Sequence, residues 1–141
     1  MKTVLIFVIA LVVLGAYAIS LRRTVAQGSS GPKESPFYCN RQAINPAQVH
    51  RKEELGKALH SLRRSIREIS DGYEFELPND PSTIHLAAEW ASLERLCCPF
   101  FEIDLRLERE AGPLWLRLSG REGVKAFIRG ELGPWVAGER P

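Results

Sequence analysis

Apolar residues recur at helical spacing in three parts of this chain. The first part follows Asn45 and Pro46, a side-chain N-cap and a proline that suits the first position of a helix. Its apolar residues are four and three positions apart, which places them on one helix face: Leu55, Leu59, Leu62, Ile66 and Ile69. This spacing predicts a helix that starts at Pro46, runs to Ile69 and is ended by Asp71-Gly72.

Two further helices are predicted nearer the C-terminus. Asp80 and Pro81 mark the start of one and Pro99 stops it, with an apolar stripe of Leu86, Trp90, Leu93 and Cys97. Ser119 and Glu122 have the spacing of a capping box, which predicts the start of a last helix. The inner face of that helix would consist of Val124, Phe127, Ile128 and Leu132.

Strict alternation of apolar and polar residues predicts three β-strands, at residues 73–77, 101–107 and 114–118. A turn around Ala111-Gly112-Pro113 would join the last two strands into a hairpin. Each strand has one polar face, which suits an antiparallel sheet covered on one side. We therefore predict an α+β fold in the order α-β-α-β-β-α. A small antiparallel three-stranded sheet would be covered by three helices on one face, in a single domain at residues 37–134.

The N-terminal region has a different pattern, because residues 3–20 contain no charged residue and are dominated by Val, Ile, Leu, Phe and Ala. Such a segment is long enough to form a hydrophobic helix that crosses a bilayer. It also has the parts of a signal peptide, with Lys2 at its start and Ala16-Tyr17-Ala18 as a small-x-small cleavage site. We predict that residues 1–26 are a signal peptide or a membrane anchor, with cleavage left open.

Residues 27–36 are rich in Gly, Ser and Pro and are predicted to be a flexible spacer. The domain that follows is expected to be membrane-anchored or secreted, and to lie on the extracytoplasmic side. The chain would contact the membrane through residues 3–20. Arg22 and Arg23 favour the opposite orientation, but such short flanks rarely decide topology alone.

Charge excludes one class of partner for this chain of 141 residues. Of its 19 Lys and Arg residues, Lys2, Arg22 and Arg23 precede Gly31, whereas all 17 Asp and Glu residues follow it. The domain is therefore nearly neutral and lacks the basic stripe that phosphate backbones require. Nucleic acid is not expected to bind, and the sequence indicates no particular protein partner.

The chain has three cysteines, the adjacent pair Cys97 and Cys98 and a separate Cys39. No Cys-x-x-Cys or His-x-x-x-His spacing occurs, so neither a zinc ribbon nor a thioredoxin-like motif is present. Because Cys98 precedes a proline, the helix should end near Cys97 and leave both thiols at its C-terminus. The negative end of the helix and Glu94 one turn back should both raise the pKa of the thiols.

The run Glu94-Arg95-Leu96-Cys97-Cys98-Pro99-Phe100 resembles a Glu-Arg-x-Cys-Cys-Pro-Phe signature of small, largely uncharacterised bacterial proteins. The resemblance extends from Tyr38-Cys39 to Leu118-Ser119-Gly120 and so covers the whole domain. It implies that Cys39, Glu94, Cys97 and Cys98 act as one site.

Two hypotheses for the function follow from these thiols. In the first, Cys39, Cys97 and Cys98 bind a soft metal or metalloid such as zinc, copper(I) or mercury(II), with Glu94 in contact with the ligands. In the second, a disulfide between Cys39 and Cys98 stabilises a structural or protein-interaction module with Trp90, Phe100 and Trp115 in its core.

An enzyme is less well supported by the residues present. No Ser-His-Asp set, nucleotide-binding loop or metal site with an open position can be assembled from the sequence. The only cofactor that the residues indicate is the soft metal ion.

Overall fold

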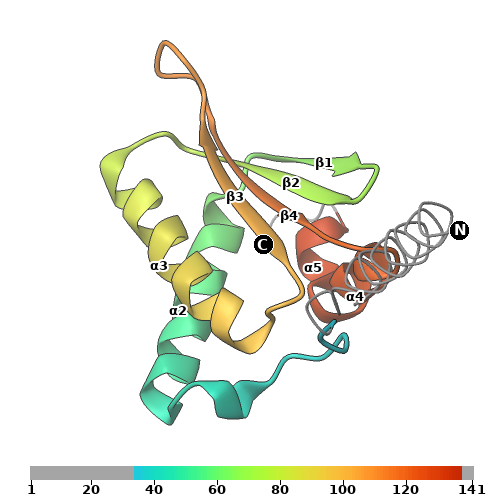
Figure 1. Ribbon diagram of the computed structural model, residues 1–141. Helices are drawn as coiled ribbons and strands as arrows, with labels where there is room; N and C mark the ends of the chain where they lie inside the picture. Colours follow the sequence, from blue (N-terminus) through green and yellow to red (C-terminus); the bar gives the residue numbers. More distant parts are fainter. Residues whose placement is uncertain (1–33, 138–141) are drawn as a thin grey trace, which may run out of the picture. The chain divides into compact units, whose positions relative to one another are not determined.

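The computed structural model describes residues 34–137 of the chain. Its sheet has four antiparallel strands in the order β1-β2-β4-β3 (Figure 1). The strands are β1 (Ser65–Ile69), β2 (Gly72–Leu77), β3 (Glu102–Leu107) and β4 (Leu114–Ser119). The α+β class and the antiparallel sheet are confirmed, whereas the prediction of three strands is wrong.

The additional strand is β1, which lies where the first predicted helix was expected to continue. Helix α2 (Pro46–Leu62) ends at Leu62, and Arg63 at its C-cap has left the helical conformation, with φ −57° and ψ 126°. Every residue of β1 is then paired with β2, and Ile66 lies opposite Phe75. The spacing of Ile66 suits a helix, but the strand pairing satisfies an edge of β2 that would otherwise expose unpaired backbone groups.

Gly72 begins β2 at a point where the backbone of β4 comes unusually close. A Cβ atom at this position would lie 2.0 Å from the carbonyl oxygen of Leu118 and 2.8 Å from the Cα of Ser119. No side chain fits in that space, because the obstructing atoms are backbone atoms. Gly72 therefore permits the pairing of β2 with β4, in addition to ending the preceding turn.

The starts of the two long helices follow the predicted capping chemistry. Asn45 and Gln48 form a reciprocal capping box at α2, each side chain accepting a hydrogen bond of 2.9 Å from the other residue's backbone amide. At α3 (Pro81–Cys97), the Asp80 carboxylate accepts hydrogen bonds from the backbone amide and the hydroxyl of Thr83. Helix α3 ends at Cys97, as Pro99 predicted.

The predicted cap of the last long helix is wrong. Helix α4 (Val124–Glu131) follows Gly123, whose φ of 97° is in the left-handed region that favours glycine. Ser119 instead ends β4, where it lies opposite both Gly72 and Glu102. Its backbone is committed to the sheet and cannot also initiate a helix. The short η1 (Arg41–Ala43) and α5 (Gly133–Val136) were not predicted.

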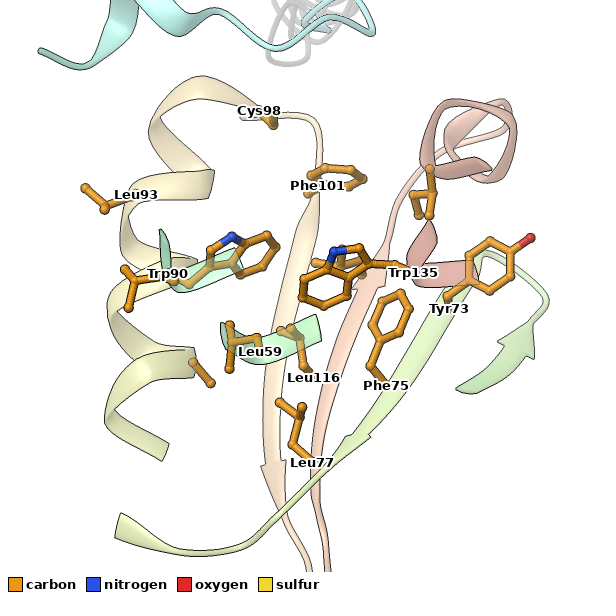
Figure 2. Close-up of a cluster of buried hydrophobic side chains, with 14 of the residues drawn as sticks. Leu59, Tyr73, Phe75, Leu77, Trp90, Leu93, Cys98, Phe101, Leu116 and Trp135 are labelled. Carbon is orange, nitrogen blue, oxygen red and sulfur yellow. The ribbon is translucent and has the colours of Figure 1, made fainter. Parts of the chain in front are cut away.

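The helices lie on one face of the sheet and enclose the core with it (Figure 1). From the two central strands, alternate side chains enter this core: Tyr73, Phe75, Leu77, Leu114, Leu116 and Leu118. Trp135 of α5 also belongs to the core, one residue beyond the predicted domain end at residue 134. Its ring stacks on that of Trp90 at 5.9 Å between centroids (Figure 2).

Trp115 lies on the opposite face of the sheet. The expectation that Trp115 contributes to the core is therefore wrong. The guanidinium of Arg67 lies over its ring, 4.3 Å from the centroid. Trp90 and Phe100, the other two expected core aromatics, are buried in the core.

Within the described part of the chain, no helix combines the length and apolar character needed to cross a bilayer. The hydrophobic helix predicted at residues 3–20 and residues 27–33 of the predicted spacer lie outside the described residues.

Candidate metal centre

The three cysteines lie together at one end of α3. Cys97 is the last residue of this helix and Cys98 is its C-cap, while Cys39 comes from the segment before η1. The three sulfur atoms all lie within 4.8 Å of one another. The amide of Asn40 donates a hydrogen bond of 2.8 Å to the carbonyl of Cys97, which holds Cys39 against the helix end.

Local backbone geometry separates the two adjacent thiols. Cys98 has left the helical conformation, with φ −125° and ψ 65°, because the proline that follows disfavours a helical residue there. Its amide still donates to the carbonyl of Glu94 at 2.8 Å. Figure 2 shows Cys98 at the end of α3, next to Phe101. The cysteine pair is therefore held in the turn that connects α3 to β3.

All three cysteines are free, and no disulfide joins Cys39 to Cys98 in the structure. Cys97 and Cys98 are buried, with 0% and 1% of their surface exposed, whereas Cys39 is partly exposed. The sulfurs of Cys97 and Cys98 are 3.8 Å apart. A ligand would reach the cluster from the side of Cys39.

Lys52 of α2 is part of this cluster and was missed from the sequence. Its ammonium nitrogen lies 3.1 Å from the sulfur of Cys97 and 3.5 Å from that of Cys39. A signal for this placement existed, because Lys52 precedes Leu55 by three residues and Leu59 by seven and so lies on their face of the helix. A lysine within an apolar stripe indicates a partner in the interior.

Glu94 is that partner. Its carboxylate accepts a hydrogen bond of 2.8 Å from Lys52, and a carboxylate oxygen lies 4.0 Å from the sulfur of Cys97. Only 14% of the Lys52 side chain and 6% of the Glu94 side chain are exposed. Removing Lys52 would leave the buried Glu94 carboxylate without its cation, which typically costs about 3–5 kcal/mol.

These contacts reverse the predicted ionisation of one thiol. A hydrogen bond with the Cys98 thiol, aided by the ammonium of Lys52, lowers the pKa of Cys97 to about 6, against the effects of burial and of Glu94. The prediction of a raised pKa is therefore wrong for Cys97, because the hydrogen bond with Cys98 and a cation from a different helix outweigh burial and Glu94. The same hydrogen bond raises the pKa of Cys98, and burial raises the pKa of Cys39.

At neutral pH the cluster therefore combines one thiolate, two thiols and an ammonium group. The thiolate can attack or bind a soft electrophilic centre, and the two thiols can add further sulfur ligands after losing their protons. Within the described residues, this set of cysteines is the group whose ligand atoms are close enough together to hold a metal ion.

Comparison of the chain with protein-family models, with curated proteins and with solved structures finds no match.

Proposed function

We propose that this domain binds one soft metal ion or metalloid through the sulfurs of Cys39, Cys97 and Cys98. The observation that supports the proposal is the mutual approach of the three sulfurs to within 4.8 Å. Two thiolates with bonds of about 2.3 Å to a shared ion lie about 3.8–4.0 Å apart, depending on the coordination geometry. The pair at 3.8 Å already has this separation, and small side-chain rotations would bring in the third sulfur.

The donor set favours soft ions over hard ones. Thiolate sulfur prefers copper(I), zinc and mercury(II), whereas magnesium and calcium prefer oxygen ligands. Three thiolates around a monovalent or divalent ion leave a net negative charge, and Lys52 supplies a cation beside it. Glu94 orients that cation rather than coordinating the ion, because its carboxylate is hydrogen-bonded to Lys52.

The ionisation of the three cysteines predicts how many protons are released when an ion binds. Cys97 is already a thiolate at pH 7.5, because its pKa is lowered to about 6. Cys39 and Cys98 retain their protons, since their pKa values are raised. Binding through all three sulfurs should therefore release about two protons per ion at this pH.

The proposal is tested by titrating the reduced full chain with zinc, copper(I) and mercury(II). Expected results are one ion per chain, release of about two protons, thiolate-to-metal absorption for copper(I) or mercury(II) and a rise in Tm with ion concentration. Cys39→Ser should weaken binding and lower the proton release by about one.

Two outcomes would overturn this function. One is a folded, reduced chain that shows neither a thermal shift nor proton release with any of the three ions. The other is full binding by the Cys97→Ser, Cys98→Ser double variant. Mutating Ser92, exposed on the same helix, to Ala provides a matched control that should leave binding unchanged.

We further propose that residues 3–20 tether or export the domain. The uncharged apolar composition of this segment supports the proposal. The full chain, fused at its C-terminus to a reporter enzyme that is active only outside the cytoplasm, should be active and either membrane-bound or secreted. Charged residues substituted for Val8 and Leu11 should abolish the reporter activity, and an unchanged activity would exclude this role.

A further inference from the structure

A cavity of about 710 Å³ adjoins the thiol cluster and is much larger than one metal ion needs. Its lining includes Cys39, Cys98, Lys52 and Glu94. Volumes of about 300–1,000 Å³ are typical of pockets that hold small organic molecules. Cys39 and Cys98 therefore border a space that a naked ion would leave almost empty.

Aromatic rings form much of the rest of the cavity wall. Trp90, Phe101, Phe127 and Trp135 all line the cavity. Trp90 and Trp135 present two stacked indole rings, with their planes 24° apart, and Phe101 lies between the indoles and Cys98 (Figure 2). Such a wall favours a flat apolar group, because ring contacts combine buried area with favourable stacking.

We propose that this cavity holds the organic group of an aryl-substituted trivalent arsenic compound while the arsenic is bound by two thiols of the cluster. This inference rests on the proposed binding of metals or metalloids and specifies its ligand class. A trivalent arsenic with one aryl group has two exchangeable positions, matching the two thiols that line the cavity, Cys39 and Cys98. An organomercury cation has only one exchangeable position and would leave one of these thiols unused.

The binding step is a ligand exchange without electron transfer. Each of the two hydroxyl groups of an arylarsonous acid leaves with one thiol proton as water. Two arsenic–oxygen bonds and two sulfur–hydrogen bonds break, while two arsenic–sulfur bonds and two water oxygen–hydrogen bonds form. The arsenic remains trivalent, its carbon–arsenic bond stays intact, and the aryl ring lies against Trp90 and Trp135.

The proposal is tested by comparing phenylarsonous acid with methylarsonous acid on the reduced full chain. The affinity of each compound for the chain is divided by its affinity for dithiothreitol. This ratio removes the intrinsic difference between the two compounds in the strength of their arsenic–sulfur bonds. Phenylarsonous acid should show an advantage of at least about tenfold, since the ring buries apolar area that a methyl group does not. It should also change the tryptophan fluorescence more than methylarsonous acid does.

Gly56 provides a variant that blocks the cavity and leaves the thiols in place. It lines the cavity from α2, and a Cβ there would meet the Trp90 indole nitrogen at an ordinary contact distance of 3.5 Å. Gly56→Leu should extend into the cavity and remove the phenyl advantage while methylarsonous acid still binds. Gly56→Ala, the matched control, should retain most of that advantage.

The outcomes separate this inference from the function on which it rests. Equal normalised affinities for the two compounds in the unsubstituted chain, or an unchanged ratio in a folded Gly56→Leu variant, would overturn the aryl pocket alone. Failure of both arsenicals and of mercury(II) to bind would overturn the metal or metalloid site itself.

Discussion

The ammonium nitrogen of Lys52 lies 3.1 Å from the sulfur of Cys97, although 45 positions separate the two residues. The same nitrogen lies 2.8 Å from the carboxylate of Glu94, so one cation lies between two groups of like charge. Interactions at this distance are strong because both charged side chains are shielded from water. The ionisation of Cys97 therefore depends on how α2 packs against α3.

We expect Lys52→Met to raise the pKa of Cys97 from about 6 toward its ordinary value of 9.0, because the ammonium group that favours the thiolate is lost. The measurement is the rate of iodoacetamide alkylation, or the thiolate absorbance, as a function of pH. Lys57→Met is the matched control, because Lys57 is exposed on the same helix. A midpoint near 6 in the folded Lys52→Met variant would show that Lys52 does not contribute.

Glu94→Gln should shift the same pKa in the opposite direction. The carboxylate of Glu94 raises the pKa of Cys97, so the neutral amide should move the alkylation midpoint below about 6. The double variant Lys52→Met, Glu94→Gln removes both buried charges and should unfold less readily than Lys52→Met alone. A midpoint that rises in Glu94→Gln would contradict the assigned role of the carboxylate.

The stability of the reduced domain should depend on pH through Cys97. Its folded pKa of about 6 lies below the ordinary 9.0, so between these values the unfolded chain binds a proton that the folded chain does not. The unfolding free energy should rise with pH across this window, by at most about 1.4 kcal/mol per unit, and this contribution is lost as pH falls through 6. Denaturant melts of Cys97→Ser should lack that slope.

Gly72→Ala should destabilise the domain by more than about 3 kcal/mol, because its Cβ would overlap the backbone of β4. Gly130 in α4 serves as the control, since a Cβ there would meet nothing within 4 Å. Gly130→Ala should stabilise by roughly 0.5 kcal/mol through helix propensity. Denaturant melts of the two variants should therefore move in opposite directions, and equal shifts would argue against the close pairing of β2 with β4.

Trp90→Ala should lower the unfolding free energy by about 3–5 kcal/mol, because Trp90 is only 3% exposed and stacks on Trp135. Leu96→Ala on the same helix is the control, with an expected loss of about 0.5 kcal/mol or less, because Leu96 is 48% exposed. A loss below about 1 kcal/mol for Trp90→Ala would show that this indole is not part of the folded core.

The sequence alone determined the elements whose signals are local. Each of these signals acts within a few residues. The caps at Asn45 and Asp80 predicted where α2 and α3 begin, and the proline after Cys98 predicted where α3 ends. The alternation of apolar and polar residues predicted where β2, β3 and β4 lie. The two adjacent thiols at the end of a helix followed from the same signals.

Tertiary structure decided β1 and the chemistry of the thiols. Residues 65–69 have apolar spacing that fits a helix, and they form a strand because β2 offers an edge of unpaired backbone groups. Burial and Glu94 both raise the pKa of Cys97, but the Cys98 hydrogen bond and the Lys52 ammonium outweigh them. Electrostatic interactions depend on distance in space, and only the packing of α2 against α3 brings Lys52 within 3.1 Å of that sulfur.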